Sequence, residues 1–226
     1  MSKVEKRART SHSAAGGGPS DSAIRAVVLD FGGVVVNWDM RHLFRKVFDD
    51  EEEMAYFLTH VLTPAENHRC DAGVPLSQVV AETSERHPRY AHALEAWRDR
   101  WIETVPAAIP GAEDLIDGLK RSGYLVLGLS NFSAETFPIC RANYPVFERF
   151  DDIVISGDVG TAKPGSEIYL LLCERNGVRP DEAVFLDDSP ANVDGALAVG
   201  MQALLFTDTR SARAALADLG VWLERE

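Results

Sequence analysis

The chain has 226 residues, 46% of them hydrophobic and 26% charged, which suffices for one ordinary domain or for a core domain with a modest insertion. The formal net charge of −12 disfavours binding to nucleic acid or to an anionic membrane, and no apolar run approaches the ~18 residues of a membrane-spanning helix. Three widely spaced cysteines form neither a disulfide framework nor a zinc motif, and they indicate reduced thiols in a cytoplasmic protein.

The first 22 residues are small, polar and basic, with a flexible Gly-Gly-Gly-Pro joint at residues 16–19. They lack the apolar segment of a secretory signal, so we expect residues 1–22 to form a disordered tail. A transit peptide is the alternative, which the shortness of the segment and the acidic Glu5 disfavour.

The segment 24–30 (IRAVVLD) predicts the first strand, because it is rich in β-branched residues, too short for a helix and closed by two glycines. Its almost continuous apolar character is typical of a strand covered on both faces. The following residues, up to about 104, carry apolar side chains at helical spacing with no strand pattern between them. We therefore expect an all-helical block inserted after the first strand.

From Pro110 onward, short strands alternate with helices. The expected helices are residues 111–123, 134–144, 164–178, 190–200 and 211–220, and the expected strands are residues 124–130, 151–156, 183–187 and 202–206. Alternation at this spacing predicts a doubly wound, Rossmann-like α/β fold, in which helices cover both faces of a parallel sheet. The predicted organisation is an α/β core of residues 23–37 and 105–226, with a helical insertion at residues 38–104.

Polar side chains stand where the predicted strands end. Asp30 ends the first strand, Ser130 ends the second, and the pair Asp187–Asp188 ends a later one. Lys163 lies in the loop that follows the strand 151–156, on the same side of the sheet. Because doubly wound sheets bind ligands at the carboxyl ends of their strands, we expect these side chains to meet in one crevice.

Such a cluster suits phosphate chemistry. Gathered carboxylates repel one another and attract a cation, and oxygen ligands with open positions suit Mg²⁺, which often bridges to a substrate phosphate. A lysine and a hydroxyl beside the metal complete a cradle for a dianion, and an aspartate held against phosphorus can attack it. Taken singly, Asp30 and the acidic pair also fit turns. Ser130 and Asn131 also fit helix caps, and Lys163 fits a solvated surface charge. Their joint occurrence at strand ends favours the functional interpretation.

Four segments resemble the signature motifs of the haloacid dehalogenase-like hydrolase superfamily, and the resemblance covers about residues 24–210. They are VVLDFGGV, LGLSNFS, AKPGSEIY and VFLDDSPANVDGA, in the family's order. The helical block matches the family's cap, which is inserted just after the first signature. The resemblance implies a hydrolase of the phosphatase branch that uses Mg²⁺ and acts on a small phosphorylated metabolite such as a sugar phosphate.

The same resemblance implies roles for individual residues. Asp30 takes the place of the nucleophile, and Lys163 takes that of the lysine that balances charge during phosphoryl transfer. The metal ligands that it implies are Asp30, the backbone carbonyl of Gly32, and Asp188. The phosphate-binding residues that it implies are Ser130, Asn131 and Lys163. Asp187 would adjoin the metal ligands or serve as an alternate ligand.

One position departs from the family's phosphatases. They usually carry a second aspartate two residues after the nucleophile, as general acid and base, whereas this chain has Gly32 there. The carbonyl of Gly32 can still bind metal, but the proton donor is lost, and general acid–base catalysis is typically worth about 10²–10⁴ in rate. Either another group supplies the proton, or the leaving group needs little help, as in sugar 1-phosphates and acyl phosphates.

The missing aspartate leaves two alternatives open. The superfamily's 2-haloacid dehalogenases also lack it, but they work without metal and without the paired acidic residues that stand here at 187 and 188. A weakly active or non-catalytic phosphate-binding member is the other alternative, and the joint presence of Asp30, Lys163 and Asp188 argues against it. We favour Mg²⁺-dependent hydrolysis of a phosphomonoester through an aspartyl phosphate on Asp30.

Several residues of the cap are candidates to face the substrate: Trp38, Arg41, Asn67, Arg69 and Asp71. Each also has a structural explanation, as packing between cap and core, as a surface ion pair or as a helix cap. Among the histidines we single out His68 as a replacement proton donor. Trp97 and Trp101, four residues apart, are expected to pack between helices or to form a dimer surface. The oligomeric state does not follow from the sequence.

Overall fold

The computed structural model describes residues 23–223, so the tail expected at residues 1–22 lies outside the described residues. Five strands form one parallel sheet in the order β3-β2-β1-β4-β5. They are β1 (Ala26–Leu29), β2 (Leu125–Ser130), β3 (Asp152–Ile155), β4 (Ala183–Asp187) and β5 (Gln202–Leu205). The chain runs outward from β1 to β3 on one side and from β4 to β5 on the other, so the strand order reverses between β1 and β4.

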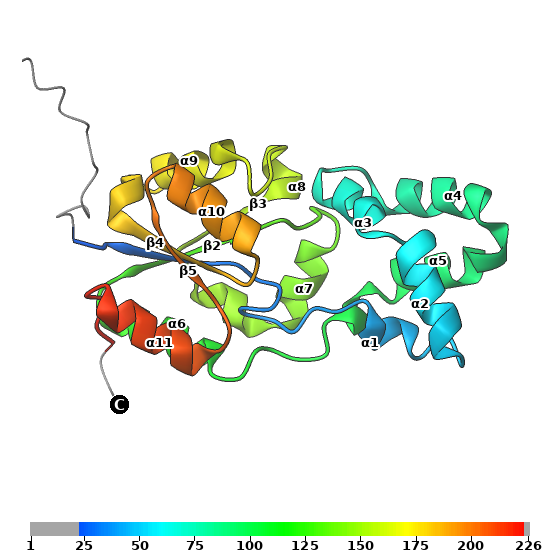
Figure 1. Cartoon of the computed structure of the whole chain (residues 1–226), viewed down its shortest axis with the longest axis horizontal. Coiled ribbons are helices and arrows are strands. Elements are labelled where there is room, and N and C mark those ends of the chain that lie inside the picture. The colour runs from blue at the N-terminus through cyan, green and yellow to red at the C-terminus, as the bar shows by residue number, and fades with distance from the viewer. Residues whose placement is uncertain (1–22, 224–226) are drawn as a thin grey trace, which may run out of the picture.

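Helices cover both faces of this sheet (Figure 1). One face carries α6 (Ala112–Arg121), α7 (Phe137–Asn143) and α11 (Thr209–Asp218), and the other carries α9 (Ser166–Arg175) and α10 (Pro190–Ala198). Val27 and Leu29 of β1 point into the first of these apolar layers, whereas Val28 points into the second. Both faces of β1 are therefore buried, which explains its continuous apolar sequence. The doubly wound α/β architecture predicted from the sequence is confirmed.

Three short elements complete the connections: α8 (Ser156–Val159), η3 (Pro145–Arg149) and η4 (Pro180–Glu182). The helix expected from residue 134 begins only at Phe137, with Pro138 in its first turn. Proline is tolerated there because the first N–H groups of a helix have no intrahelical partner to lose. Among the described residues, no helix combines the length and apolar character that a bilayer-crossing segment needs.

Between β1 and α6 the chain is helical, and we refer to residues 41–104 as the helical block. Its elements are α1 (Arg41–Phe44), α2 (Glu51–His60), α3 (Pro64–Asp71), α4 (Leu76–Arg86), η1 (Pro88–Tyr90), α5 (Ala91–Asp99) and η2 (Trp101–Thr104). The sequence encodes these helices locally: the Asp50 carboxylate caps α2 by accepting from the N–H of Glu52, at the end where acidic residues are favoured. Buried aromatic rings, Phe44 and Phe57 among them, give the block an apolar interior that is continuous with the apolar layer on one face of the sheet.

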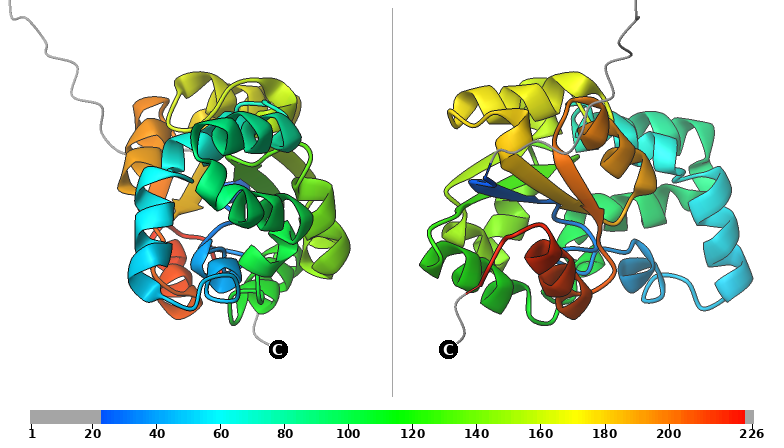
Figure 2. Two further views of the ribbon diagram at one scale, coloured as in Figure 1. Left: turned by 90° about the vertical axis from the view of Figure 1, so that its right-hand side faces the viewer. Right: turned by 60° about the vertical axis from the view of Figure 1, so that its left-hand side comes forward.

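The helical block lies beyond the end of the sheet at which the strands terminate, as Figures 1 and 2 show from three directions. Two antiparallel segments join it to the sheet. The N–H of Asn37 donates to the carbonyl of Ala107 (2.9 Å), and the N–H of Asp39 donates to the carbonyl of Thr104 (3.0 Å). The segment that enters the helical block and the segment that returns from it are therefore hydrogen-bonded to each other near the sheet.

Candidate active site

The turn after β1 requires a glycine at position 33. The carbonyl oxygen of Phe31 accepts hydrogen bonds from the N–H groups of Val35 (2.8 Å) and Val36 (2.9 Å), which curls the chain back on itself. Gly33 has a φ of +74°, in the left-handed region that favours glycine. A Cβ atom at this position would also clash with the carboxylate of Asp188. The turn thus packs directly against the residue that follows β4.

The buried centre of the site is an ion cluster around Lys163. Its Nζ lies 2.8 Å from Oδ1 of Asp30 and 2.6 Å from Oδ2 of Asp187, and it donates to the carbonyl of Leu129 (3.0 Å). Lys163 is 3% exposed, Asp30 8% and Asp187 0%, so water screens these charges little. The first and fourth strands and the loop after the third thus place their charged side chains together, as the sequence predicts.

This cluster has more negative than positive charge. One carboxylate oxygen each from Asp30, Asp187 and Asp188 lie within 4.8 Å of one another, and Asp188 is exposed. Burial raises the pKa of Asp30 to about 6, and Asp187 adds to the rise, while Lys163 opposes it. Burial and the charge of Asp187 also raise the pKa of Asp188. A cation beside these carboxylates would stabilise their charged forms.

The donor chemistry fits a hard divalent cation such as Mg²⁺. Such ions take oxygen ligands, and the three carboxylates lie close enough to share one ion. Oδ1 of Asp30 is buried and has no partner with hydrogen-bond geometry, although Nζ of Lys163 is 2.8 Å away as an ion-pair neighbour. Lys163 is thus the one ion-pair partner of this oxygen among the described residues.

Asp187 has a different environment from its neighbour Asp188. Its carboxylate accepts from Nζ of Lys163, from the N–H of Ser189 (2.8 Å) and from Nδ2 of Asn192 (3.1 Å to Oδ1 and 3.0 Å to Oδ2). These bonds fix Asp187 toward Lys163. The sequence analysis does not single out Asn192. Its position within the fourth motif is the feature that could have identified it as part of the site.

Ser130 and Asn131 follow β2 into the same site. Ser130 is buried and lines the cavity described below. Nδ2 of Asn131 donates to the carbonyl of Lys163 (2.9 Å), and its Oδ1 accepts from the N–H of Lys163 (2.8 Å). The resemblance implies that Asn131 binds phosphate, and what the structure shows is that its side-chain amide holds the loop of Lys163 in place.

A cavity of about 330 Å³ lies between the strand ends and the helical block. Its polar side includes Asp30, Ser130, Lys163 and Asp188, and its opposite side is largely apolar. The large apolar residues that line it are Trp38, Leu76, Trp97, Trp101 and Phe132. Trp97 and Trp101 are buried, as expected for packing residues, but they pack around a cavity. Their helical spacing predicts burial without indicating what they face.

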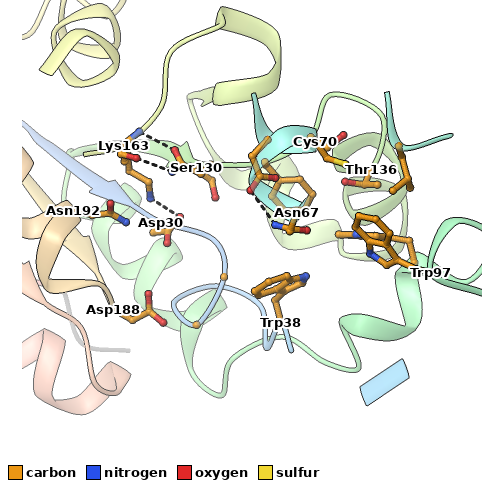
Figure 3. A pocket seen from close by; sticks show the side chains of 18 residues that line it. Asp30, Trp38, Asn67, Cys70, Trp97, Ser130, Thr136, Lys163, Asp188 and Asn192 are labelled. Carbon is orange, nitrogen blue, oxygen red and sulfur yellow. Dashed lines mark hydrogen bonds and ion pairs between the residues drawn. The ribbon is translucent and has the colours of Figure 1, made fainter. Parts of the chain in front are cut away.

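Three of the five candidate residues from the cap reach this cavity: Trp38, Asn67 and Asp71. Figure 3 shows Trp38 and Asn67 on the side of the cavity away from the strands. Nδ2 of Asn67 donates to Oδ2 of Asp71 (3.0 Å), so the two side chains form one polar group within a mostly apolar wall.

The two arginine candidates are engaged elsewhere. Arg41 lies 3.6 Å from Asp39 in an exposed ion pair. Arg69 pairs with Glu66 (2.9 Å) and contacts Glu82 on the next helix. His68 is exposed and is not among the residues that line the cavity, so its position gives no support to the expectation that it donates a proton there.

Comparison with known proteins identifies the family. The family model for haloacid dehalogenase-like hydrolases matches residues 24–200. This chain belongs to that family. The resemblance read from the four motifs is confirmed, and the protein is a hydrolase of the haloacid dehalogenase-like type.

Relatives within the family differ in reaction. Flavin mononucleotide hydrolase 1 of Arabidopsis thaliana is 33% identical over 133 residues, which are 50% of this chain and 54% of that protein. The phosphorylated carbohydrates phosphatase of Thermotoga maritima is 25% identical over 131 residues, or 58% and 60% of the two chains. (S)-2-haloacid dehalogenase 4A of Burkholderia cepacia is 30% identical over 90 residues, or 40% and 39%. Each match spans less than two thirds of the relative's length.

Solved structures of family members share the fold. A predicted haloacid dehalogenase-like (HAD-like) family hydrolase from Porphyromonas gingivalis superposes with a TM-score of 0.68 at 24% identity, over 88% of this chain and 98% of that one. A family enzyme from Bacteroides thetaiotaomicron, solved as a magnesium complex, gives a TM-score of 0.66 at 20% identity, over 83% and 96%. At these identities the similarity shows the common fold alone.

Proposed function

We propose that this hydrolase is a Mg²⁺-dependent phosphomonoesterase that acts on a small phosphorylated metabolite, with Asp30 as the nucleophile. The observation that most supports the proposal is the group of three carboxylates at the ends of β1 and β4, with Lys163 between two of them. Such a group is electrostatically unfavourable without a cation, and a cation beside a nucleophilic carboxylate suits a phosphate dianion.

In this proposal Asp30, the carbonyl of Gly32 and Asp188 would hold Mg²⁺. Asp187 already accepts three kinds of hydrogen-bond donor, so it orients Lys163 rather than serving as the main ligand. When bound, the ion would neutralise charge on the phosphoryl oxygens. Asp188 is the exposed member of the three carboxylates and is the one most open to a ligand from the cavity.

The chain's own residues then divide the chemistry. An oxygen of Asp30 attacks phosphorus, the bond from phosphorus to the leaving oxygen breaks, and an aspartyl phosphate forms. The ammonium of Lys163 and the hydroxyl of Ser130 hold the phosphoryl oxygens in place. Water then attacks the phosphorus and releases phosphate, which restores the carboxylate of Asp30. Asn131 keeps Lys163 in position through its two backbone hydrogen bonds.

The cavity suggests what the rest of the substrate is like. A space of about 330 Å³ is at the lower end of ligand pockets, which suits a small metabolite. Its wall opposite the carboxylates is built from Trp38, Trp97 and Trp101, so we propose an organic group with an apolar or planar face. A panel of phosphomonoesters that compares aromatic, aliphatic and sugar esters tests this, since fully polar sugars should be poorer substrates.

The nucleophile is tested by D30N in an assay of phosphate release from p-nitrophenyl phosphate with Mg²⁺. Activity should fall to background, while the matched D39N variant, which changes an exposed aspartate of the same connection, should keep it. Activity retained by D30N would refute the assignment of the nucleophile. The dehalogenase alternative predicts halide release from a 2-haloacid that excess EDTA does not affect, whereas our proposal requires EDTA to abolish phosphate release.

A further inference from the structure

The position at which the family's phosphatases usually carry their proton donor has no side chain in this protein. Gly32 stands there, and a Cβ atom built on it would find its nearest neighbour, Cβ of Trp38, at 3.8 Å. A side chain would therefore fit, so steric crowding does not explain the glycine. If the chain hydrolyses esters of ordinary alcohols, a different residue has to protonate the leaving oxygen, and it has to do so from the side of the cavity opposite Asp30, because attack is in line.

Asp71 is a carboxyl group that lines this cavity from the helical block. It is the last residue of α3, and Asp30 lines the same cavity. Asn67, one turn earlier on α3, donates to Oδ2 of Asp71 (3.0 Å) and reaches into the cavity (Figure 3). This bond orients the carboxyl group, which is only partly exposed to solvent.

The backbone of Asp71 is tied to the loop that carries the phosphate-binding candidates. Oγ of Ser156 donates to the carbonyl of Asp71 (2.6 Å) and accepts from the N–H of Phe132 (3.0 Å). Phe132 follows Ser130 and Asn131 directly. Two hydrogen bonds thus fix a residue of the helical block relative to the catalytic end of β2. Positioning of this kind is what a group needs in order to act on the substrate.

We propose that Asp71 is the general acid–base of this enzyme, an inference that rests on the function proposed above. Its carboxylic acid gives a proton to the leaving oxygen as the bond from phosphorus to that oxygen breaks, which releases a neutral alcohol. The resulting carboxylate then takes a proton from the water that attacks the aspartyl phosphate. When the bond between phosphorus and Asp30 breaks, phosphate leaves and Asp71 is protonated again.

The surroundings of Asp71 suit this exchange. Burial raises its pKa to about 7, and the negative charge of Asp30 on β1 adds to the rise. The main cause is burial, which does not depend on the charge state of Asp30. Two nearby charges on the same helix, Arg69 and Glu66, pair with each other. A third, Glu135 in the loop after β2, accepts a hydrogen bond from the N–H of Leu76. Near neutral pH, both protonation states of Asp71 are populated, as acid–base catalysis requires.

This assignment also narrows the substrate class. An enzyme with a proton donor at the leaving oxygen can hydrolyse phosphate esters of ordinary alcohols, whose alkoxides leave poorly without protonation. The expectation that the leaving group needs little help, as in sugar 1-phosphates and acyl phosphates, is then unnecessary. The inferred substrate is the phosphate ester of an alcohol whose organic part lies against the tryptophan-lined wall.

The test compares leaving groups in wild type and in D71N, with Mg²⁺ present. p-Nitrophenolate leaves without protonation, so the pre-steady-state burst of p-nitrophenol from D71N should keep its rate to within about 3-fold. Hydrolysis of an aliphatic ester such as phenethyl phosphate should fall by about 10²–10⁴. The asparagine of D71N keeps a side-chain oxygen that can accept the hydrogen bond from Asn67. A burst of p-nitrophenol from D71N also shows that the variant is folded and that its Asp30 still reacts.

The control is E85Q, which removes an exposed carboxylate of the helical block, on α4, that does not line the cavity. It should leave the ratio between the two substrates unchanged. If D71N loses both reactions equally, or hydrolyses the aliphatic ester at the wild-type rate, Asp71 is not the acid. If the proposed phosphatase function were wrong, the result would differ from a failure of the Asp71 assignment alone. The wild type itself would then give neither a burst nor Mg²⁺-dependent phosphate release.

Discussion

The buried ammonium of Lys163 gives a quantitative test of the site, through the change to methionine. Methionine keeps a long unbranched side chain and removes the charge, leaving Asp30 and Asp187 without their shared partner at 2.8 and 2.6 Å. Removing one member of a buried ion pair costs about 3–5 kcal/mol, because the remaining charge stays buried. For a domain of this size, each kcal/mol lowers Tm by about 2–4 °C, so we expect K163M to melt roughly 6–20 °C below wild type.

The pH dependence of this loss follows from Asp30. Its pKa is raised from 3.8 to about 6 in the folded protein, and Lys163 opposes that rise, so K163M should raise it further. A carboxyl group whose folded pKa exceeds its unfolded value stabilises the fold only while it is protonated, and that stabilisation is lost as pH rises through the folded pKa. The difference in Tm between variant and wild type should therefore be smaller near pH 5 than near pH 8.

Thermal melting in the presence of EDTA measures both effects. The control is K120M, which removes a lysine that pairs with Asp151 at 2.8 Å on the surface, where it is 37% exposed. Exposed pairs contribute about 0–1 kcal/mol, so K120M should shift Tm by no more than ~4 °C. Equal shifts in the two variants, or a deficit in K163M that does not depend on pH, would refute the account of a buried charge cluster.

Two further predictions concern the turn and the thiols. G33A should destabilise the fold by about 1–3 kcal/mol and abolish any thermal stabilisation by Mg²⁺, because the new Cβ strains a left-handed backbone and displaces Asp188. G123A, with a φ of +84° and no atom within 4 Å of the added Cβ, should show the strain but keep the response to Mg²⁺. The three cysteines are free and buried, and burial raises the pKa of Cys140 to about 12, so a thiol reagent should label Cys140 and Cys173, which do not line the cavity, only after denaturation.

The predictable part of the site depends on topology. In a parallel sheet that is wound in both directions, the carboxyl ends of all strands lie on one edge, and ligands bind where the strand order reverses. Asp30 follows β1 and Asp187 ends β4, on the two sides of that reversal. Once the strands are recognised from their apolar runs, the meeting of these residues follows without knowledge of any loop. The meeting of Asp30 with the acidic pair was therefore accessible from strand positions alone, whereas that of Lys163 depended also on the side of the sheet from which its loop emerges.

The unpredicted part depends on how loops and helices meet. Helical spacing shows that Trp97 and Trp101 lie on a buried face, but burial beside a cavity and burial in solid packing give the same pattern. The two hydrogen bonds between Asn131 and Lys163 join residues that are 32 positions apart. Arg69 was a candidate for the substrate because of its charge, yet Glu66, three residues earlier on the same helix, already neutralises it.

The two parts of the molecule divide the proposed reaction between them. Asp30, Lys163 and Asp188 come from strand ends and from the loop after β3, so the machinery for phosphate belongs to the sheet. The tryptophan-lined wall and Asp71 come mainly from the helical block, so the surroundings of the leaving group belong to it. Substitutions of the wall residues within 41–104, Asp71 excepted, should then change which esters are hydrolysed while leaving the reaction at phosphorus intact. The hydrogen bond from Ser156 to Asp71 is one of the contacts that hold the two parts together, and it fixes the backbone of the proposed acid against the phosphate-binding loop.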